Sequence, residues 1–333
     1  MGKVFYIGSF PPPYGGVTVK NSLLFSNLSE VVTMKKIDLM KVKRGNIREI
    51  MQLAAALFGK DGRLVLGLSA GWRSRITKLL MVFNKNTMAR SVVFVMGGAI
   101  PDSKDAQRLD CFSKVYVETA GMKHDFELMG ANNVYVYPNC RSRIEGAGSV
   151  RIVSKKGNGL SCVYFSLISR MKGADMLLDV AEKNSDIEVH FYGSIDKEYE
   201  RVFTNRISSM DNVTYHGYFD SVSNNPSVEM AKYDVHVFPT LCLDEGVPGV
   251  IVESKIAGIP TVATNRCRNA ELIEDGVDGI LLASESAECL SAALSKIKED
   301  KNLLNSLKRG ARHSAEAFYI DTYLEQLIED IEY

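Results

Sequence analysis

Residues 233–263 read YDVHVFPTLCLDEGVPGVIVESKIAGIPTVA, and this stretch decides the fold. Its apolar run Val235–Phe238, closed by a proline, predicts a buried strand. Pro248 suits the first turn of a helix, where its missing N–H costs nothing. That helix should end at Gly258, because Pro260 stops it from continuing. The next strand follows at once, so the stretch predicts one strand–helix–strand unit of a parallel sheet.

The loop before this helix carries the residues that suggest chemistry. Backbone N–H groups near Gly246–Val250 should point out of a helix N-terminus, which favours bound phosphate. Glu245 lies on the loop, and Glu253 lies eight positions later inside the helix. Carboxylates accept hydrogen bonds from hydroxyls and repel phosphate. The pair therefore indicates a ligand with sugar hydroxyls at both ends of a diphosphate, which is the layout of a nucleotide sugar.

This stretch resembles the E-x7-E region of the retaining glycosyltransferases of family 4, which have the GT-B fold. The match is Glu245-Gly246-Val247-Pro248-Gly249-Val250-Ile251-Val252-Glu253, followed by Ala257-Gly258-Ile259-Pro260. Two glutamates at this spacing occur by chance, but the whole order of motifs is specific. The resemblance implies that residues 246–250 and Glu253 bind the donor and that Glu245 is catalytic. The alternative is an ordinary strand–helix unit with two solvated glutamates.

Length and composition predict a two-domain globular protein. The chain has 333 residues, of which 46% are hydrophobic and 24% charged. Its six cysteines are scattered without a CxxC pair, so we expect reduced thiols in the cytosol and no disulfide framework or zinc site. We also expect no signal peptide, no bilayer-spanning segment and no nucleic-acid partner.

Charge is distributed unevenly along the chain. Residues 1–155 hold 23 Lys and Arg against 11 Asp and Glu, whereas residues 156–333 hold 17 against 29. The basic first half is a candidate for an anionic surface or substrate. Within it, residues 71–90 predict one helix with apolar residues at helical spacing, Trp72 and several cations. Such a helix can lie on an anionic membrane; alternatively it is a core helix with solvated charges.

Two glycine-rich strand ends in the first half are candidate ligand sites. Val4–Ile7 predicts a strand, followed by a loop ending in Gly15 and Gly16 and then a helix. This pair resembles the family's first loop, near the donor diphosphate or the acceptor; the alternative is a plain turn. Residues 91–95 predict another strand that ends in Met96-Gly97-Gly98. Many relatives carry a histidine at the Met96 position, on the acceptor side, and the two glycines leave room for a ligand.

A polar segment, residues 141–159, predicts an interdomain linker. After the strand that follows it, Ser169-Arg170-Met171-Lys172-Gly173 resembles the family's G-R-L-x-x-x-K-G motif, whose cations hold the donor phosphates. Lys172 matches the lysine, but Leu167 stands at the arginine position. Arg170 is a possible substitute, or else a solvated loop residue. Gly193 resembles the family's turn near the nucleotide.

Together these patterns predict an α/β protein with the GT-B fold: two Rossmann-like parallel-sheet domains facing a cleft. Residues 1–150 form the acceptor-binding domain, 151–315 the nucleotide-sugar-binding domain, and 316–333 a helix returning to the first domain. The expected reaction moves a sugar from a nucleotide-diphosphate sugar, UDP-linked in our interpretation, to an acceptor hydroxyl with retention. No D-x-D motif is placed to bind a metal, so we expect no cofactor and no metal.

The expected acceptor is a saccharide or a polyprenyl-diphosphate-linked saccharide. A cytoplasmic protein, peripheral on the inner face of the membrane, would use it in bacterial lipopolysaccharide, O-antigen or capsule biosynthesis. Three alternatives remain open. Leu167 and Met96 keep an inactive GT-B scaffold or binding protein possible, and a GT-B nucleotide-sugar epimerase would need no acceptor. An NAD-dependent oxidoreductase is disfavoured because the G-x-G-x-x-G spacing is absent.

Overall fold

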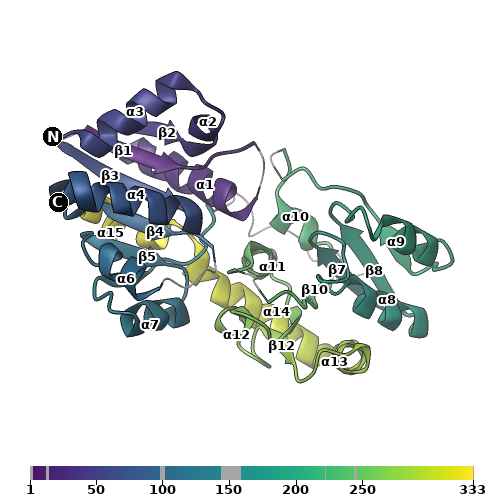
Figure 1. The fold of residues 1–333 in the computed structure, drawn as a ribbon. Helices are drawn as coiled ribbons and strands as arrows, with labels where there is room; N and C mark the ends of the chain where they lie inside the picture. Colours follow the sequence, from purple (N-terminus) through teal and green to yellow (C-terminus); the bar gives the residue numbers. More distant parts are fainter. Residues whose placement is uncertain are drawn as a thin grey trace. The chain divides into compact units, whose positions relative to one another are not determined.

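The computed structural model divides the chain into two compact units, residues 1–143 with 318–333 and residues 144–317. The predicted boundaries, 150/151 and 315/316, lie seven and two residues from these. Each unit is built on one six-stranded sheet in which every strand pair is parallel, as the alternation of strands and helices predicts (Figure 1). The structure describes residues 3–12, 15–97, 102–143, 159–221, 223–243 and 246–332.

The first sheet has the strand order β2-β1-β3-β4-β5-β6. Its strands are β1 (Lys3–Gly8), β2 (Met34–Asp38), β3 (Gly62–Leu68), β4 (Val92–Val95), β5 (Lys114–Val117) and β6 (Val134–Val136). The helices of this unit are α1 (Gly16–Val31), α2 (Leu39–Lys43), α3 (Ile47–Phe58), α4 (Ala70–Phe83), α5 (Lys85–Met88), α6 (Ser103–Leu109), α7 (Ala120–Leu128) and α15 (Asp321–Glu332).

A buried asparagine on α1 joins the two strands between which this order changes direction. The Asn21 side-chain nitrogen donates to the carbonyls of Ser9 (3.1 Å) and Gly67 (3.2 Å), and its oxygen accepts from the Tyr6 hydroxyl (2.8 Å). A Cβ at Gly67 would lie 1.7 Å from that oxygen. Because any side chain there would displace the asparagine, Gly67 is required for α1 to lie this close to β3.

The final helix, α15, belongs to the first unit. Figure 1 shows it in yellow among the purple and blue elements of that unit. Leu327 and Ile331 enter the core of the first unit. The Tyr116 hydroxyl donates to Asp330, and the Arg63 guanidinium donates to the Ile331 carbonyl at 3.0 Å. The last residues of the chain therefore complete the core that the first 143 begin.

The helix predicted over residues 71–90 is wrong as a single element. Two helices, α4 and α5, replace it, and the break lies at Asn84. The Asn84 side-chain nitrogen donates to the carbonyls of Leu57 (3.0 Å) and Gly59 (2.7 Å) at the end of α3, while its oxygen accepts from the Thr87 N–H (3.3 Å). Asparagine ends helices by making such local bonds with its side chain, and apolar periodicity does not record them.

The second sheet has the order β12-β11-β10-β7-β8-β9, which reverses direction between β7 and β10. Its strands are β7 (Leu160–Phe165), β8 (Ile187–Tyr192), β9 (Val213–Tyr215), β10 (Val235–Phe238), β11 (Thr261–Thr264) and β12 (Gly279–Leu282). The helices are α8 (Ala174–Lys183), α9 (Glu200–Ile207), α10 (Pro226–Met230), α11 (Gly249–Ala257), α12 (Asn269–Leu272), α13 (Ala287–Glu299) and α14 (Lys301–Ala315), with a 3₁₀ turn at Glu316–Phe318.

Polar contacts fix α11 from behind. The Lys255 ammonium is buried, pairs with the buried Asp278 carboxylate and donates to the Ser314 hydroxyl at 2.8 Å. Burial lowers the pKa of Lys255, and the Asp278 carboxylate opposes that change. The Ser254 hydroxyl lies 2.6 Å from the Thr261 hydroxyl on β11. These contacts hold the helix that carries the predicted donor residues at a set position over the sheet.

His236, in the middle of β10, is the most deeply buried titratable ring near this helix. Its Nδ1 lies 3.1 Å from the Thr261 hydroxyl, and its Nε2 has no hydrogen-bond partner among the described residues. Burial lowers the pKa of His236 to about 3. The ring is therefore neutral in the folded protein, whereas the unfolded chain takes up a proton near pH 6.5.

This difference predicts a loss of stability in acid. Because the unfolded state binds the extra proton, the contribution of His236 is fully present above pH 6.5 and is lost as the pH falls toward 3. Between pH 7 and pH 5 the loss should be about 2 kcal/mol. Chemical denaturation of the wild type and of His236→Gln at both pH values should show a smaller decrease for the variant. An equal decrease in both, with the exposed His313→Gln as control, would contradict this assignment.

Candidate functional site

The point where the second sheet reverses its strand order is the expected ligand site of such a fold. Strands β7 and β10 pair directly there, with Cys162 opposite Val235. Ligands of open parallel sheets bind outside the carboxyl ends of the strands at such a point. Two segments leave these ends: residues 166–173 after β7 and residues 239–248 after β10. All the donor motifs predicted near a phosphate, apart from Gly193 and the first loop, lie on these segments or on α11.

Hydrogen bonds join the two segments. The Leu241 N–H donates to the Met171 carbonyl at 2.8 Å. Below them, the buried Tyr164 hydroxyl lies 2.8 Å from the Leu167 carbonyl and 3.1 Å from the Lys172 carbonyl. The first segment is thus a closed turn whose backbone is fixed both by its own strand and by the neighbouring segment.

Gly173 is the residue that lets the segments meet. It precedes α8 with φ +76°, a left-handed conformation that side chains disfavour. A Cβ built on it would lie 2.0 Å from the Pro239 carbonyl oxygen. Glycine is therefore required twice, once for the backbone conformation and once for the close approach of the second segment.

Lys172 lies in the turn immediately before α8, where its N–H donates to the Ser169 carbonyl at 3.2 Å. Its side chain is half-buried. Leu167, which stands at the family's arginine position, is 44% exposed. The structure thus brings Lys172 to the edge of the sheet where a phosphate is expected and puts an apolar side chain at the place of the second cation.

Arg170, the possible substitute, is engaged by α8. Its side chain is 67% exposed, its Nε lies 3.6 Å from the Asp175 carboxylate, and its guanidinium lies over the Tyr199 ring at 5.8 Å. Asp175 also accepts from the Tyr199 hydroxyl at 2.5 Å. Burial, with the Asp175 carboxylate beside it, raises the pKa of Tyr199, so the phenol stays a donor. Arg170 therefore shares a carboxylate that already has other partners.

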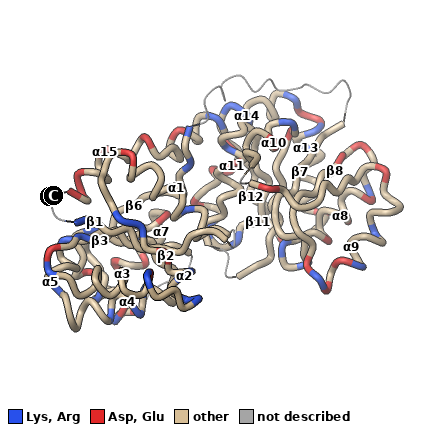
Figure 2. The backbone as a smooth tube through the Cα atoms, turned by 90° about the horizontal axis from the view of Figure 1, so that it is seen from above, with Lys and Arg blue, Asp and Glu red and all other residues tan. Residues whose placement is uncertain are grey.

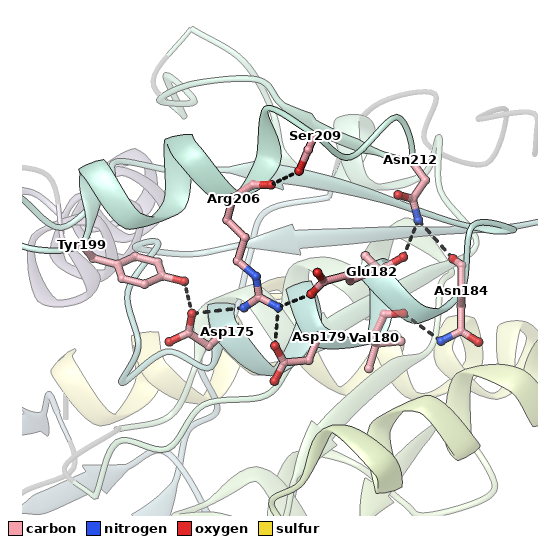
Figure 3. Close-up of polar contacts among 10 residues, drawn as sticks. Asp175, Asp179, Val180, Glu182, Asn184, Tyr199, Arg206, Ser209 and Asn212 are labelled. Atoms are coloured by element: carbon pink, nitrogen blue, oxygen red, sulfur yellow. Dashed lines mark hydrogen bonds and ion pairs between the residues drawn. The ribbon is translucent and has the colours of Figure 1, made fainter.

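One of those partners is Arg206 of α9 (Figure 3). Its guanidinium lies 3.5 Å from Asp175 and 2.9 Å from Glu182, and it also pairs with Asp179 between them. The three carboxylates lie one turn apart on one face of α8. Arg206 thus bridges the three carboxylates of that face and fixes Asp175, the residue that orients Arg170.

The N-terminus of α11 is the second feature of the site. Pro248 is its N-cap residue and has no side-chain hydrogen bond to offer, and no acidic residue lies in the first turn. The helix begins at Gly249, one residue later than the sequence indicates. Val247 and Pro248 are buried, whereas Gly246, Gly249 and Val250 are partly exposed. The positive end of the helix dipole therefore meets solvent next to glycines, an arrangement that favours an anion.

The two predicted glutamates have different outcomes. Glu253 lies one turn into α11, four residues after Gly249, and is half-buried. Its side chain therefore lies on the same helix face as the first residues of α11 and leans toward them. Glu245 and its neighbour Asp244 lie outside the described residues.

Gly193, predicted near the nucleotide, has a structural reason to be glycine. It has φ +140°, and a Cβ there would lie 1.9 Å from the Ser166 carbonyl oxygen. Its own carbonyl accepts from the Tyr215 hydroxyl at 3.0 Å. The residue allows β8 to end directly against the segment that follows β7, which supports the shape of the site.

The candidate residues of the first unit lie at the carboxyl edge of its sheet. Gly15 caps α1, and its N–H donates to the Thr18 hydroxyl at 3.0 Å. A Cβ at Gly15 or Gly16 would meet nothing within 4 Å. Met96 is buried, with 6% of its surface exposed, and Gly97 has φ +95°. Gly98 lies outside the described residues.

Comparison with known proteins identifies this architecture. Residues 151–314 match the model of the family described as glycosyl transferases group 1. These residues form a group 1 glycosyl transferase domain. An exopolysaccharide phosphotransferase of Streptomyces coelicolor is 31% identical over 116 residues, which are 33% of this chain. The match spans only 12% of that relative's length.

Solved structures show the fold of the whole chain. An Anabaena protein, HepE, crystallised in complex with UDP, superimposes with a TM-score of 0.73 at 15% identity, and the match covers 99% of both chains. The lipopolysaccharide outer core galactosyltransferase WaaB gives a TM-score of 0.67 at 12% identity, also over 99% of both chains. At these identities the likeness establishes the fold: this group 1 glycosyl transferase has the GT-B fold.

Sequence reasoning missed several residues of the site. Asp175, Tyr199 and Arg206 orient Arg170, yet they come from two helices whose separation in sequence hides the contact. Glu118, the residue after β5 in the first unit, is buried and lines a pocket together with Met96. Its place after a strand was the only signal for it in the sequence.

The meeting of the two segments predicts a matched pair of glycine variants. Gly173 and Gly276 have almost the same φ, +76° and +74°, but a Cβ at Gly276 meets nothing within 4 Å. Gly276→Ala should lower the free energy of unfolding by about 1 kcal/mol through backbone strain alone. Gly173→Ala should cost an additional 1–3 kcal/mol, roughly, because the Pro239 carbonyl must move. Equal costs, measured by chemical denaturation, would show that the close contact contributes nothing.

Proposed function

We propose that this protein transfers a sugar from a nucleotide-diphosphate donor, UDP-linked, to a saccharide or lipid-linked saccharide acceptor, with retention of configuration. One observation carries the proposal: the N-terminus of α11, without a side-chain cap, opens at the switch point of the second sheet, where Lys172 also lies. The Anabaena structure supports it, because a protein of this fold is described there in complex with UDP.

The residues of the site suit a leaving diphosphate. When the bond between the sugar's anomeric carbon and the phosphate oxygen breaks, negative charge grows on that oxygen. Lys172 and the N–H groups of α11 would stabilise it. The acceptor oxygen forms the new bond on the same face of the sugar, and its proton passes to the departing phosphate oxygen. Glu253 would hold the nucleotide ribose and Glu245 the hydroxyls of the donor sugar. In this scheme neither a protein nucleophile nor a metal ion is needed.

Arg170 is proposed as the second cation of the site. Its side chain is mostly exposed and its ion pair with Asp175 is 3.6 Å long, so a diphosphate competes for it with a weakly held carboxylate. If Arg170 left Asp175 and paired with a donor phosphate, it would supply the positive charge that Leu167 lacks.

The donor site is tested by UDP binding with and without EDTA. Calorimetry should show that UDP binds the wild type equally in both conditions, and UDP at about 100 times its dissociation constant should add about 2.7 kcal/mol to the stability of the folded state. Lys172→Met should weaken UDP binding at least tenfold, since a charged hydrogen bond contributes about 1.5–3 kcal/mol. Glu253→Gln should weaken it as well, whereas the exposed Lys183→Met should not.

The same samples distinguish the alternatives. Conversion of the donor without an acceptor would favour an epimerase. Donor binding without turnover, with lipid-linked and soluble acceptors present, would favour an inactive scaffold, the function to which Leu167 points. Failure of every nucleotide sugar to bind would overturn the proposal.

The acceptor is proposed to be lipid-linked and to be met at an anionic membrane surface. The names of two similar proteins, an exopolysaccharide phosphotransferase and a lipopolysaccharide galactosyltransferase, support a role in surface polysaccharide assembly. No helix among the described residues is long and apolar enough to cross a bilayer. We propose that contact with the membrane comes from a surface of the first unit, because the first half of the chain carries the excess of Lys and Arg.

Helix α3 presents such a surface. Its apolar residues recur every three or four positions, yet this face is turned to solvent. Ile47 is 74% exposed, Met51 67% and Phe58 52%. Val82 (73%) and Phe83 (64%) at the end of α4 continue it, and the rings of Phe58 and Phe83 meet edge to face at 5.4 Å. An amphipathic helix normally buries this face in its own core, so a contiguous exposed apolar stripe indicates a surface that meets something apolar.

Cations surround this stripe. Figure 2 shows Lys and Arg along α2, α4 and α5, which lie on the same part of the first unit as α3. The exposed cations on helices α2 to α5 and just after α2 and α5 are Lys41, Lys43, Arg44, Arg48, Arg75, Lys78, Lys85 and Arg90. An apolar stripe bordered by cations fits an anionic lipid surface, where each cation contributes about 1 kcal/mol.

Vesicle binding tests this surface. The wild type should sediment with vesicles that contain phosphatidylglycerol at low salt and should be released at high salt. Met51→Asp with Val82→Asp should reduce binding at least tenfold, while UDP binding stays unchanged. The matched control is Val202→Asp on α9, whose residue is 39% exposed in the acidic second unit. Loss of dimerisation rather than of vesicle binding in the stripe variant would assign the stripe to a protein interface instead.

A further inference from the structure

A small pocket opens at the carboxyl edge of the first sheet. Its walls come from α1, from the ends of β4 and β5, and from the segment after β6. Phe94, Tyr116 and Met96 form much of its apolar wall, and Lys20 and Glu118 are its charged residues. Its enclosed part has room for about one water-sized group. The pocket is therefore lined like a ligand site, with a mostly apolar wall and few polar groups.

The two charges form an ion pair in which Glu118 is buried and Lys20 is mostly buried. The Lys20 ammonium donates to Oε1 of Glu118, and the side chains are 14% and 7% exposed. Lys20 comes from the second turn of α1 and Glu118 from the residue after β5, so the pair joins two elements 98 residues apart in sequence. Removing two charges from water is costly, and apolar residues of the same size often serve stability as well. The presence of this ion pair in a pocket wall therefore indicates a role other than stabilising the fold.

The second carboxylate oxygen of Glu118 indicates a role in ligand binding. Oε2 is buried and has no hydrogen-bond partner among the described residues. An ionised carboxylate has about four acceptor positions, and leaving a buried one unused is unfavourable. A donor that enters the pocket removes this penalty.

We propose that Glu118 and Lys20 form an acceptor-recognition site, in which Oε2 of Glu118 accepts a hydrogen bond from one hydroxyl of the acceptor sugar. The size of the enclosed space matches a hydroxyl, and the apolar wall matches the C–H face beside it. A phosphate is disfavoured because it would meet the carboxylate, and a cation would compete with Lys20. Glu118 is a specificity residue here and takes no proton during transfer.

This inference rests on the proposed function, so its test measures the two sites separately. UDP binding, by calorimetry, reports the donor site in the second unit. Binding of a panel of methyl glycosides (glucoside, galactoside, rhamnoside and N-acetylglucosaminide), by saturation-transfer NMR, reports the pocket. The variants are Glu118→Gln, which keeps the shape and removes the charge, and the double variant K20M/E118M, which removes the buried pair together and should fold. Glu127→Gln, on the exposed face of α7, is the control.

We expect at least one glycoside to bind the wild type and the control, and to bind both pocket variants at least tenfold more weakly, with UDP affinity unchanged. Where transfer is measurable, the acceptor KM should rise by the same factor while the donor KM stays constant. Equal glycoside binding by wild type and variants would overturn the assignment, as would a wild type that binds none. If the wild type bound a glycoside but not UDP, and the pocket variants lost the glycoside, the pocket assignment would stand and the proposed donor would be rejected.

Discussion

The close approach of two backbone segments at the switch point of the second sheet is the constraint on which its site depends. The Pro239 carbonyl occupies the place where any side chain at position 173 would begin. Only because Gly173 is glycine does the end of β7 bring Lys172 beside the segment that leads to α11. Behind that helix, the buried pair of Lys255 and Asp278 fixes its distance from the sheet. The geometry of the candidate site therefore follows from a close backbone contact and one buried ion pair.

In the first unit a different contact holds the first helix at the place where the strand order changes direction. Its strand order changes direction between β1 and β3, and there Asn21 of α1 reaches the carbonyls of Ser9 and Gly67. In one unit a glycine admits a neighbouring backbone, and in the other a glycine admits a polar side chain. In both, the helix after the first strand is held against the place where a parallel sheet binds its ligands. The units thus share a topology without sharing the contact that stabilises it.

Much of this was predictable from the sequence. Alternating apolar runs and helical periods predict two parallel sheets, and the motif from Glu245 to Pro260 predicts the helix at the site. What sequence could not supply are contacts between distant elements. Arg170 counts as a free cation until Asp175, Tyr199 and Arg206 are seen around it. Asn84 divides a regular helical pattern through bonds to another helix. Periodicity also predicts an apolar face on α3 but not whether that face turns inward.

The chain passes from the first unit to the second once after Arg143 and returns once before Phe318. At these passages the two segments lie side by side, because the Arg141 N–H donates to the Phe318 carbonyl at 2.8 Å and the Ile320 N–H to the Arg141 carbonyl at 3.0 Å. The second unit is therefore an insertion whose entry and exit are joined by hydrogen bonds of its host. Such a unit can be exchanged as a whole between these positions during evolution, while the core completed by α15 stays intact.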